Sequence, residues 1–81
     1  KNNNLTIIIY PNPASEDIFL SGAHSYNVNE IRIKNILGEE IKRNILGSGE
    51  KINISELQNG IYFLEIYRNN KLISTKKISK Q

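Results

Sequence analysis

The stretch Ile61–Ser79, "IYFLEIYRNNKLISTKKIS", decides the fold of this chain. Its first part, Ile61–Arg68, alternates in the way a β-strand does, and Tyr62, Leu64 and Ile66 share one face of it. The opposite face is also apolar except for one glutamate. A strand that is apolar on both faces is typical of the centre of a sheet.

The asparagine pair Asn69-Asn70 follows this strand directly. It predicts a two-residue hairpin turn, because asparagine tolerates a positive φ. The next strand, Leu72–Ser79, is polar and lysine-rich, and lysines discourage unwanted pairing at the edge of a sheet. We therefore predict a hairpin that joins a central strand to an edge strand.

The rest of the chain repeats this pattern. Isoleucine occurs 15 times, and short apolar runs with a period of two are separated by Gly, Asn, Ser and Pro. The further predicted strands are Leu5–Tyr10, Asp17–Ser21, Glu30–Lys34, Ile41–Ile45 and Lys51–Ile54, with Ile31, Ile33, Ile52 and Ile54 facing inward. About seven short strands predict an all-β fold, a small immunoglobulin-like antiparallel β-sandwich. A five- or six-stranded barrel is the alternative.

Two connections carry specific turn signals. Gly38 lies in a tight connection after Glu30–Lys34, where glycine adopts a positive φ at little cost. The segment 55–60 is predicted to be a turn that anchors Leu57 and ends on the turn dipeptide Asn59-Gly60.

The motif "YPNPAS" ends the first predicted strand. Pro11 and Pro13 lack an N–H group, so a hydrogen-bond ladder cannot continue through them. The side chain of Asn12 is predicted to accept a hydrogen bond from the backbone N–H two residues on, in an Asx-turn. This motif has a sufficient structural role even if no partner reads it.

Composition limits the chemistry that this chain can perform. It has 81 residues, which favours one domain, and it has no cysteine. His24 is the only histidine, and no nucleophile motif, phosphate-binding loop or metal-ligand spacing is present, so we expect no enzyme activity, no metal and no cofactor. No apolar run is long enough to span a bilayer, so we expect no membrane insertion.

Charge is divided unevenly along the chain. Residues 1–67 hold six basic and eight acidic side chains, whereas residues 68–81 hold five basic side chains and no acidic one. Such a basic end marks either an interaction surface or a solvated edge strand. Residues 1–4, "KNNN", are expected to be the end of a linker from an upstream domain, with residues 5–81 forming the domain itself.

Four segments occur in one order: "IYPNPASEDIFL", "IRIKNILGEEI", "LQNGIYFLEI" and "STKKISK". The ordered set, from Ile8 to Lys80, resembles the C-terminal sorting domain of the type IX secretion system in its commoner, type A form. The resemblance implies a domain at the extreme C-terminus of a cargo protein in certain Gram-negative bacteria. Cargo reaches the periplasm by an N-terminal Sec signal, and the type IX machinery carries it across the outer membrane. A sortase-like cysteine protease removes the domain upstream, and the cargo is released or joined to surface lipopolysaccharide.

The resemblance also implies which residues matter for sorting. The recognition motif maps onto Pro11, Asn12, Pro13, Gly38, Leu57, Gly60, Tyr62, Lys76, Lys77 and Lys80. Cleavage would fall near or before residues 1–4. We expect the last strand to dock on an outer-membrane partner by backbone pairing, with the lysines steering it toward an acidic surface.

Other interpretations stay open at this point. The chain could be a structural or carbohydrate-binding β-sandwich module of a secreted enzyme or adhesin, although it has no tryptophan. Nucleic-acid binding through the basic end is the weakest interpretation, because packing explains the neighbouring aromatic residues. An exposed final strand also makes an edge-strand dimer plausible. The activity of the cargo leaves no trace in these residues.

Overall fold

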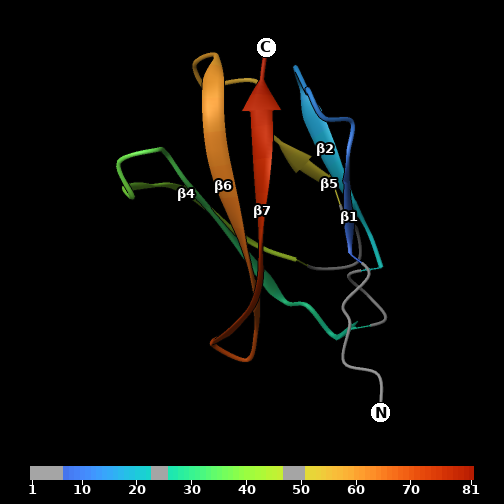
Figure 1. Cartoon of the computed structure of the whole chain (residues 1–81). Coiled ribbons are helices and arrows are strands. Elements are labelled where there is room, and N and C mark those ends of the chain that lie inside the picture. The colour runs from blue at the N-terminus through green and yellow to red at the C-terminus, as the bar shows by residue number, and fades with distance from the viewer. Residues whose placement is uncertain (1–6, 23–25, 47–50) are drawn as a thin grey trace.

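The computed structural model describes residues 7–22, 26–46 and 51–81 (Figure 1). These residues form seven strands and no α-helix, which confirms the all-β prediction. The strands are β1 (Ile8–Tyr10), β2 (Asp17–Ser21), β3 (Glu30–Lys34), β4 (Glu40–Ile45), β5 (Lys51–Asn53), β6 (Gly60–Arg68) and β7 (Lys71–Lys80). Of the predicted first strand, Leu5 and Thr6 lie outside the described residues.

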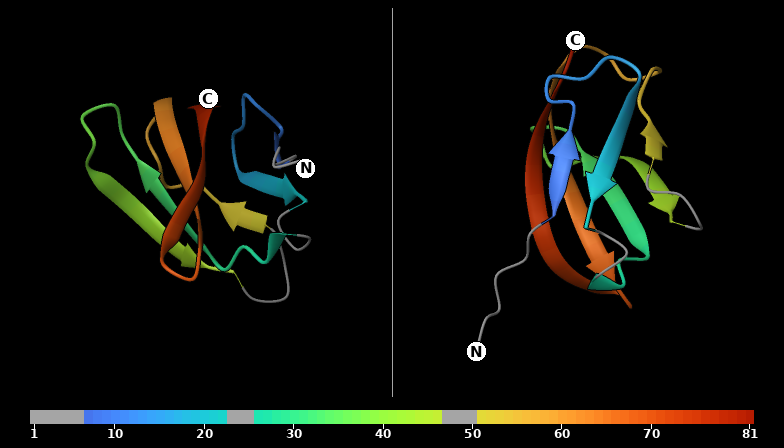
Figure 2. Two further views of the ribbon diagram at one scale, coloured as in Figure 1. Left: turned by 60° about the horizontal axis from the view of Figure 1, so that its bottom comes forward. Right: turned by 90° about the vertical axis from the view of Figure 1, so that its right-hand side faces the viewer.

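The strands form two antiparallel sheets that face each other (Figure 2). One sheet has the order β1-β2-β5 and the other has the order β4-β3-β6-β7. Some consecutive strands are neighbours within the same sheet, namely β1 and β2, β3 and β4, and β6 and β7. The other connections cross from one sheet to the other. Such crossings are typical of immunoglobulin-like sandwiches. The sandwich prediction is confirmed, and the barrel alternative is wrong because the strands divide into two separate sheets.

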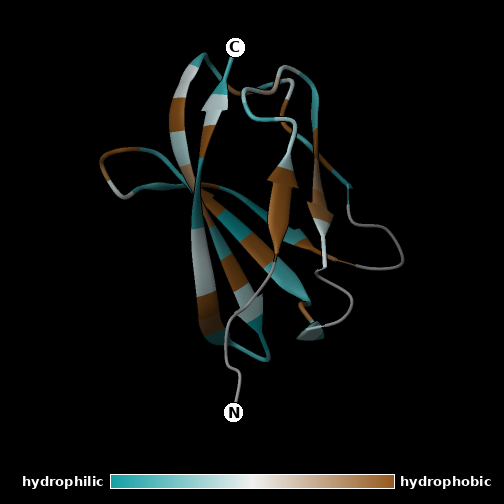
Figure 3. Ribbon diagram, turned by 45° about the vertical axis from the view of Figure 1, so that its right-hand side comes forward, coloured by the Kyte–Doolittle hydropathy of each residue, from teal (hydrophilic) through white to brown (hydrophobic). Residues whose placement is uncertain are grey.

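The core fills the space between the sheets with aliphatic side chains. Ten large side chains are almost fully buried: Ile7, Ile18, Leu20, Ile31, Ile33, Ile52, Ile54, Leu64, Ile66 and Ile78. Figure 3 shows apolar and polar residues alternating along the strands. Burial of one such side chain contributes about 1.5–3 kcal/mol. The predicted inward faces of the third, fifth and sixth strands are therefore confirmed.

The hairpin of β6 and β7 is the longest element of the fold. β6 pairs with β3 on one side and β7 on the other, and β7 is the last strand of its sheet. Asn69 and Asn70 both have positive φ, at 51° and 67°. The register shifts so that Ile73 has no partner in β6. The central strand, the edge strand and the asparagine turn are thus confirmed.

Candidate functional site

The Pro11-Asn12-Pro13 segment lies against the end of β7. The Asn12 Nδ2 group donates a hydrogen bond to the Lys77 carbonyl oxygen at 3.1 Å, and the Ser79 N–H donates to Asn12 Oδ1 at 3.0 Å. The prediction of an Asx-turn is wrong, because the Ala14 N–H that it required donates to the Ser79 carbonyl oxygen at 2.9 Å.

This contact joins the two sheets at one end of the sandwich. The Gln81 N–H donates to the Ala14 carbonyl oxygen at 2.8 Å, and Ala14 forms a parallel bridge with Lys80. Both bonds that precede the prolines are cis. Residues 12–14 therefore cover the last part of the β7 edge, which the sequence did not predict. We call this contact the corner clip.

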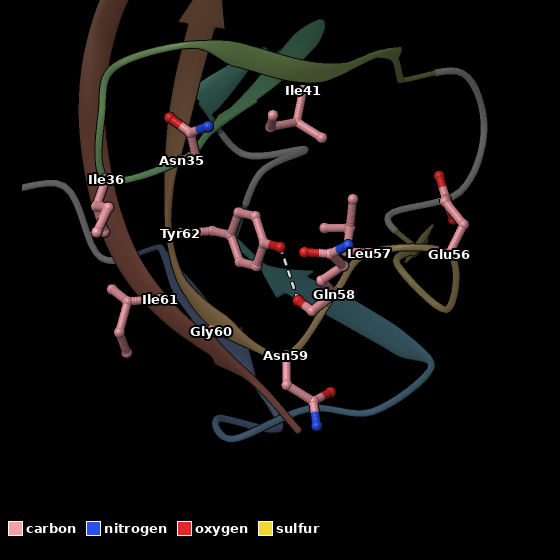
Figure 4. Close-up of a pocket in the computed structure, with 10 residues that line it drawn as sticks. All are labelled: Asn35, Ile36, Ile41, Glu56, Leu57, Gln58, Asn59, Gly60, Ile61 and Tyr62. Atoms are coloured by element: carbon pink, nitrogen blue, oxygen red, sulfur yellow. Dashed lines mark hydrogen bonds between the residues drawn. The ribbon is translucent and has the colours of Figure 1, made fainter.

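The segment between β5 and β6 forms a tyrosine corner. The Tyr62 hydroxyl donates a hydrogen bond to the Gln58 carbonyl oxygen at 2.7 Å, and Leu57 is buried beneath the loop (Figure 4). Immunoglobulin-like sandwiches use such a tyrosine at the start of the corresponding strand. Gly60 has φ +152°, where a side chain would be strained. Leu57, Gly60 and Tyr62 thus have a structural role in shaping this loop.

The turn between β3 and β4 depends on Gly38 and on Asn35. Gly38 has φ +85°, as predicted. Asn35 Oδ1 accepts hydrogen bonds from the N–H groups of Leu37 and Glu39, at 2.9 and 3.0 Å. The Gly38 N–H donates to the Asn35 carbonyl oxygen at 3.0 Å. The role of Asn35 in this turn was not predicted from the sequence, although an asparagine three residues before a glycine is a turn signal.

A pocket of about 460 Å³ opens between this turn and the tyrosine corner (Figure 4). It is lined by Asn35, Ile36, Ile41 and residues 56–62. The pocket exists because β3 and β6 stop pairing at Lys34 and Phe63, whereas β6 and β7 pair as far as Gly60 and Lys80. Three of the sequence-predicted site residues (Leu57, Gly60 and Tyr62) line it, and Gly38 lies in the adjoining turn.

The three lysines of the predicted motif have different surroundings. Lys77 is exposed, Lys76 is half-buried and Lys80 is only 7% exposed. This follows from strand alternation, because Lys76 and Lys80 lie on the same face of β7 as the core residue Ile78. Lys80 therefore does not present its side chain as openly as Lys77 does.

The basic residues fall into two groups, those that form ion pairs with described carboxylates and those that do not. Within the described parts of the chain, each basic residue of β3 and β4 pairs with a carboxylate, at 2.8–3.4 Å. No basic residue among 68–81 forms an ion pair with another described residue. Within the described residues, the positive charge of the C-terminal strand thus has no carboxylate partner.

The paired charges form a network on the outer face of the four-stranded sheet. Arg43 binds both carboxylate oxygens of Glu40 at 2.9 Å and lies 3.4 Å from Glu30, which also binds Arg32. The Arg32 guanidinium lies 4.0 Å from the centre of the Tyr67 ring. The hydrogen bond from Arg43 lowers the pKa of Glu40, and the hydrogen bond to Glu30 raises the pKa of Arg32. The two arginines and the two glutamates of this network are thus all paired.

The described residues contain neither a metal centre nor a membrane-spanning helix. In residues 7–22, 26–46 and 51–81, no three His, Cys, Asp or Glu side chains are placed to hold a metal ion. No helix in that part of the chain is long and apolar enough to cross a membrane. His24 lies outside the described residues.

A tyrosine corner and two antiparallel sheets joined by crossing connections define a small immunoglobulin-like β-sandwich. The family described as "Secretion system C-terminal sorting domain" matches residues 8–81 of the chain. The chain therefore belongs to the C-terminal sorting domains of the type IX secretion system, as the sequence resemblance implied. Its family is one of sorting signals rather than of catalysts. None of the curated proteins matches the chain.

Proposed function

We propose that this domain directs a cargo protein fused upstream of it from the periplasm across the outer membrane. The family match over residues 8–81 carries the proposal, because it assigns the chain to type IX sorting signals, whose cargo is exported to the surface or secreted. A sortase-like cysteine protease then cleaves the chain near or before residues 1–4. The cargo is released or joined to surface lipopolysaccharide.

The type IX machinery binds the open part of the β7 edge, which is the part that residues 12–14 leave uncovered. Because peptide groups along a strand face alternate sides, the Thr75 N–H and C=O face the same way as those of Ser79. Residues 12–14 occupy this side at Lys77 and Ser79. No described residue occupies it at Thr75. A partner strand placed there would gain backbone hydrogen bonds.

Charge favours an acidic partner at this edge. Lys76 and Lys77 follow Thr75 directly and have no ion pair with any other described residue, so they would steer the edge toward an acidic surface. The same edge could pair with the β7 of a second copy. That dimer brings like charges together and is the weaker use of the edge.

The experiment that tests the function is an export assay. Residues 1–81 are attached to the C-terminus of a fluorescent reporter that carries a Sec signal. We expect reporter in the medium or on the surface of a strain with an intact type IX system, and reporter trapped in the periplasm of a strain without the translocon. Periplasmic reporter in both strains would refute the proposal. Mass spectrometry of the exported reporter locates the cleavage site.

A second candidate function is carbohydrate binding by the three-stranded sheet. Tyr10 and Phe19 stack on its outer face with ring centroids 5.5 Å apart, and they are 49% and 36% exposed. Exposed aromatic rings on a flat sheet suit the apolar faces of sugars. Calorimetry with polysaccharides tests this, and binding that Tyr10→Ala removes would favour it.

A further inference from the structure

The start of β6 has an unpaired edge inside the pocket. The Asn29 N–H donates to the Tyr67 carbonyl oxygen at 3.1 Å, so the peptide groups of Tyr67 face β3. Alternation along the strand turns those of Glu65, Phe63 and Ile61 the same way. β3 pairs with Glu65 and with Phe63, and its pairing with β6 ends there, before Ile61. The Ile61 N–H and C=O thus have no strand partner among the described residues.

The walls around this edge are mostly apolar, and one charged residue lines them. Ile41, Leu57 and the Tyr62 ring face the hollow, and the exposed Ile36 side chain lies at its margin (Figure 4). Glu56 is the one charged residue that lines the pocket, and its carboxylate binds Lys42 Nζ at 2.8 Å. An unpaired N–H and C=O pair beside apolar walls matches an extended peptide that inserts an apolar side chain.

We infer that this pocket binds an extended, uncharged segment of a protein of the type IX machinery. The backbone of the segment pairs with Ile61, and one large apolar side chain enters between Ile41, Leu57 and Tyr62. The inference rests on the proposed function and adds a second contact to it. The two contacts lie on opposite sides of the β6–β7 hairpin, so one partner can hold both strands.

Two adjacent residues provide a matched pair of variants for the export assay. Ile36 and Leu37 are 71% and 78% exposed at the same turn, but only Ile36 lines the pocket. We expect Ile36→Asp to lower export at least about tenfold, because a carboxylate at the margin of the pocket would have to lose water beside the apolar side chain that enters it. Leu37→Asp is expected to leave export within about twofold of the parent. Thermal unfolding of both variants checks that neither change unfolds the domain.

The outcomes separate this inference from the proposed function. If the parent fusion is not exported, the function fails. If the parent is exported and the two variants equal it or fall together, the pocket inference is overturned while the function stands.

Hydrogen exchange of the Ile61 amide gives a direct readout. The domain is mixed with outer-membrane fractions from the intact strain and from the strain without the translocon. We expect exchange at least about tenfold slower with the intact fraction alone, because a new hydrogen bond protects the amide. Equal exchange with both fractions would overturn the inference. Slower exchange that instead follows the concentration of the domain itself would assign the pocket to a second copy and also overturn it.

Discussion

The two edge strands of the four-stranded sheet, β4 and β7, are treated in opposite ways. The two cations of β4, Lys42 and Arg43, both bind carboxylates, at 2.8 and 2.9 Å. The lysines of β7 have no ion pair with any other described residue. Acidic side chains are present near β4 and absent after residue 67. The difference teaches that charge at one edge is used within the fold, whereas no described residue pairs with the charge at the other.

Reversing charge on β7 is expected to have the largest effect. Lys76→Glu with Lys77→Glu should lower export at least about 100-fold, because like charges then face an acidic partner. Lys80 stays unchanged since it is buried. The matched control, Lys51→Glu with Lys71→Glu, changes net charge equally, but on β5 and at the hairpin end of β7, away from the open edge at Thr75. Normal export of the first double variant would remove the distinction between the two edges.

Removing the corner clip would lengthen the open part of the β7 edge. Asn12→Ala removes two hydrogen bonds to β7 and should lower the free energy of unfolding by about 1–2 kcal/mol. Asn12→Asp keeps the acceptor for the Ser79 N–H and should lose about half as much. Chemical denaturation measures both. An unchanged midpoint for Asn12→Ala would mean that the clip adds no stability.

The hydrogen bond of the Tyr62 hydroxyl lies within the tyrosine corner, so its removal tests the fold and leaves the ring in the pocket wall. Tyr62→Phe removes the hydrogen bond to the Gln58 carbonyl and should cost about 1 kcal/mol. Export is expected to follow the fraction of folded protein and no more. If export fell strongly in a variant that melts like the parent, the hydroxyl would have a role in recognition.

Acid should weaken the β4 edge slightly. Arg43 holds the pKa of Glu40 below its ordinary value of 4.5, so the pair stabilises the folded state at neutral pH. That contribution is lost as the pH falls below 4.5 and through the lowered pKa. The effect is small because the pair is exposed. Melting curves against pH should show a shallower acid decline for Arg43→Gln, and an unchanged decline for Lys76→Gln.

The local features of the fold were predictable from the sequence. Strand alternation placed Ile31 and Ile33 inside, because the period of two acts within a few residues. The turns at Gly38 and at Asn69-Asn70 were predictable because turn preferences also depend on only a few neighbouring residues. The partners of Asn12 were not, since they lie 65 and 67 residues away and depend on how the sheets meet. The burial of Lys80 follows from its parity with Ile78, a signal present in the sequence but not used.

The pocket could not be predicted, because it depends on where two strands stop pairing. Nothing in the residues of β3 indicates that its contact with β6 ends at Phe63. The turn that anchors Leu57 and ends at Gly60 was predictable, but the hydrogen bond of the Tyr62 hydroxyl to the Gln58 carbonyl oxygen was not. Which of the motif residues contact the machinery stays a prediction.

The corner clip also has a mechanical consequence. β1 runs toward the end of the sandwich where the C-terminus and the clip lie (Figure 2). If cargo pulls on β1 while a partner holds β7, tension passes from Tyr10 through residues 11–14 and directly into β7. The pairing of β1 with β2 shares this load. Under load, the hydrogen bonds of Asn12 and Ala14 would be the link that bears the tension between the cargo and the strand held by the partner.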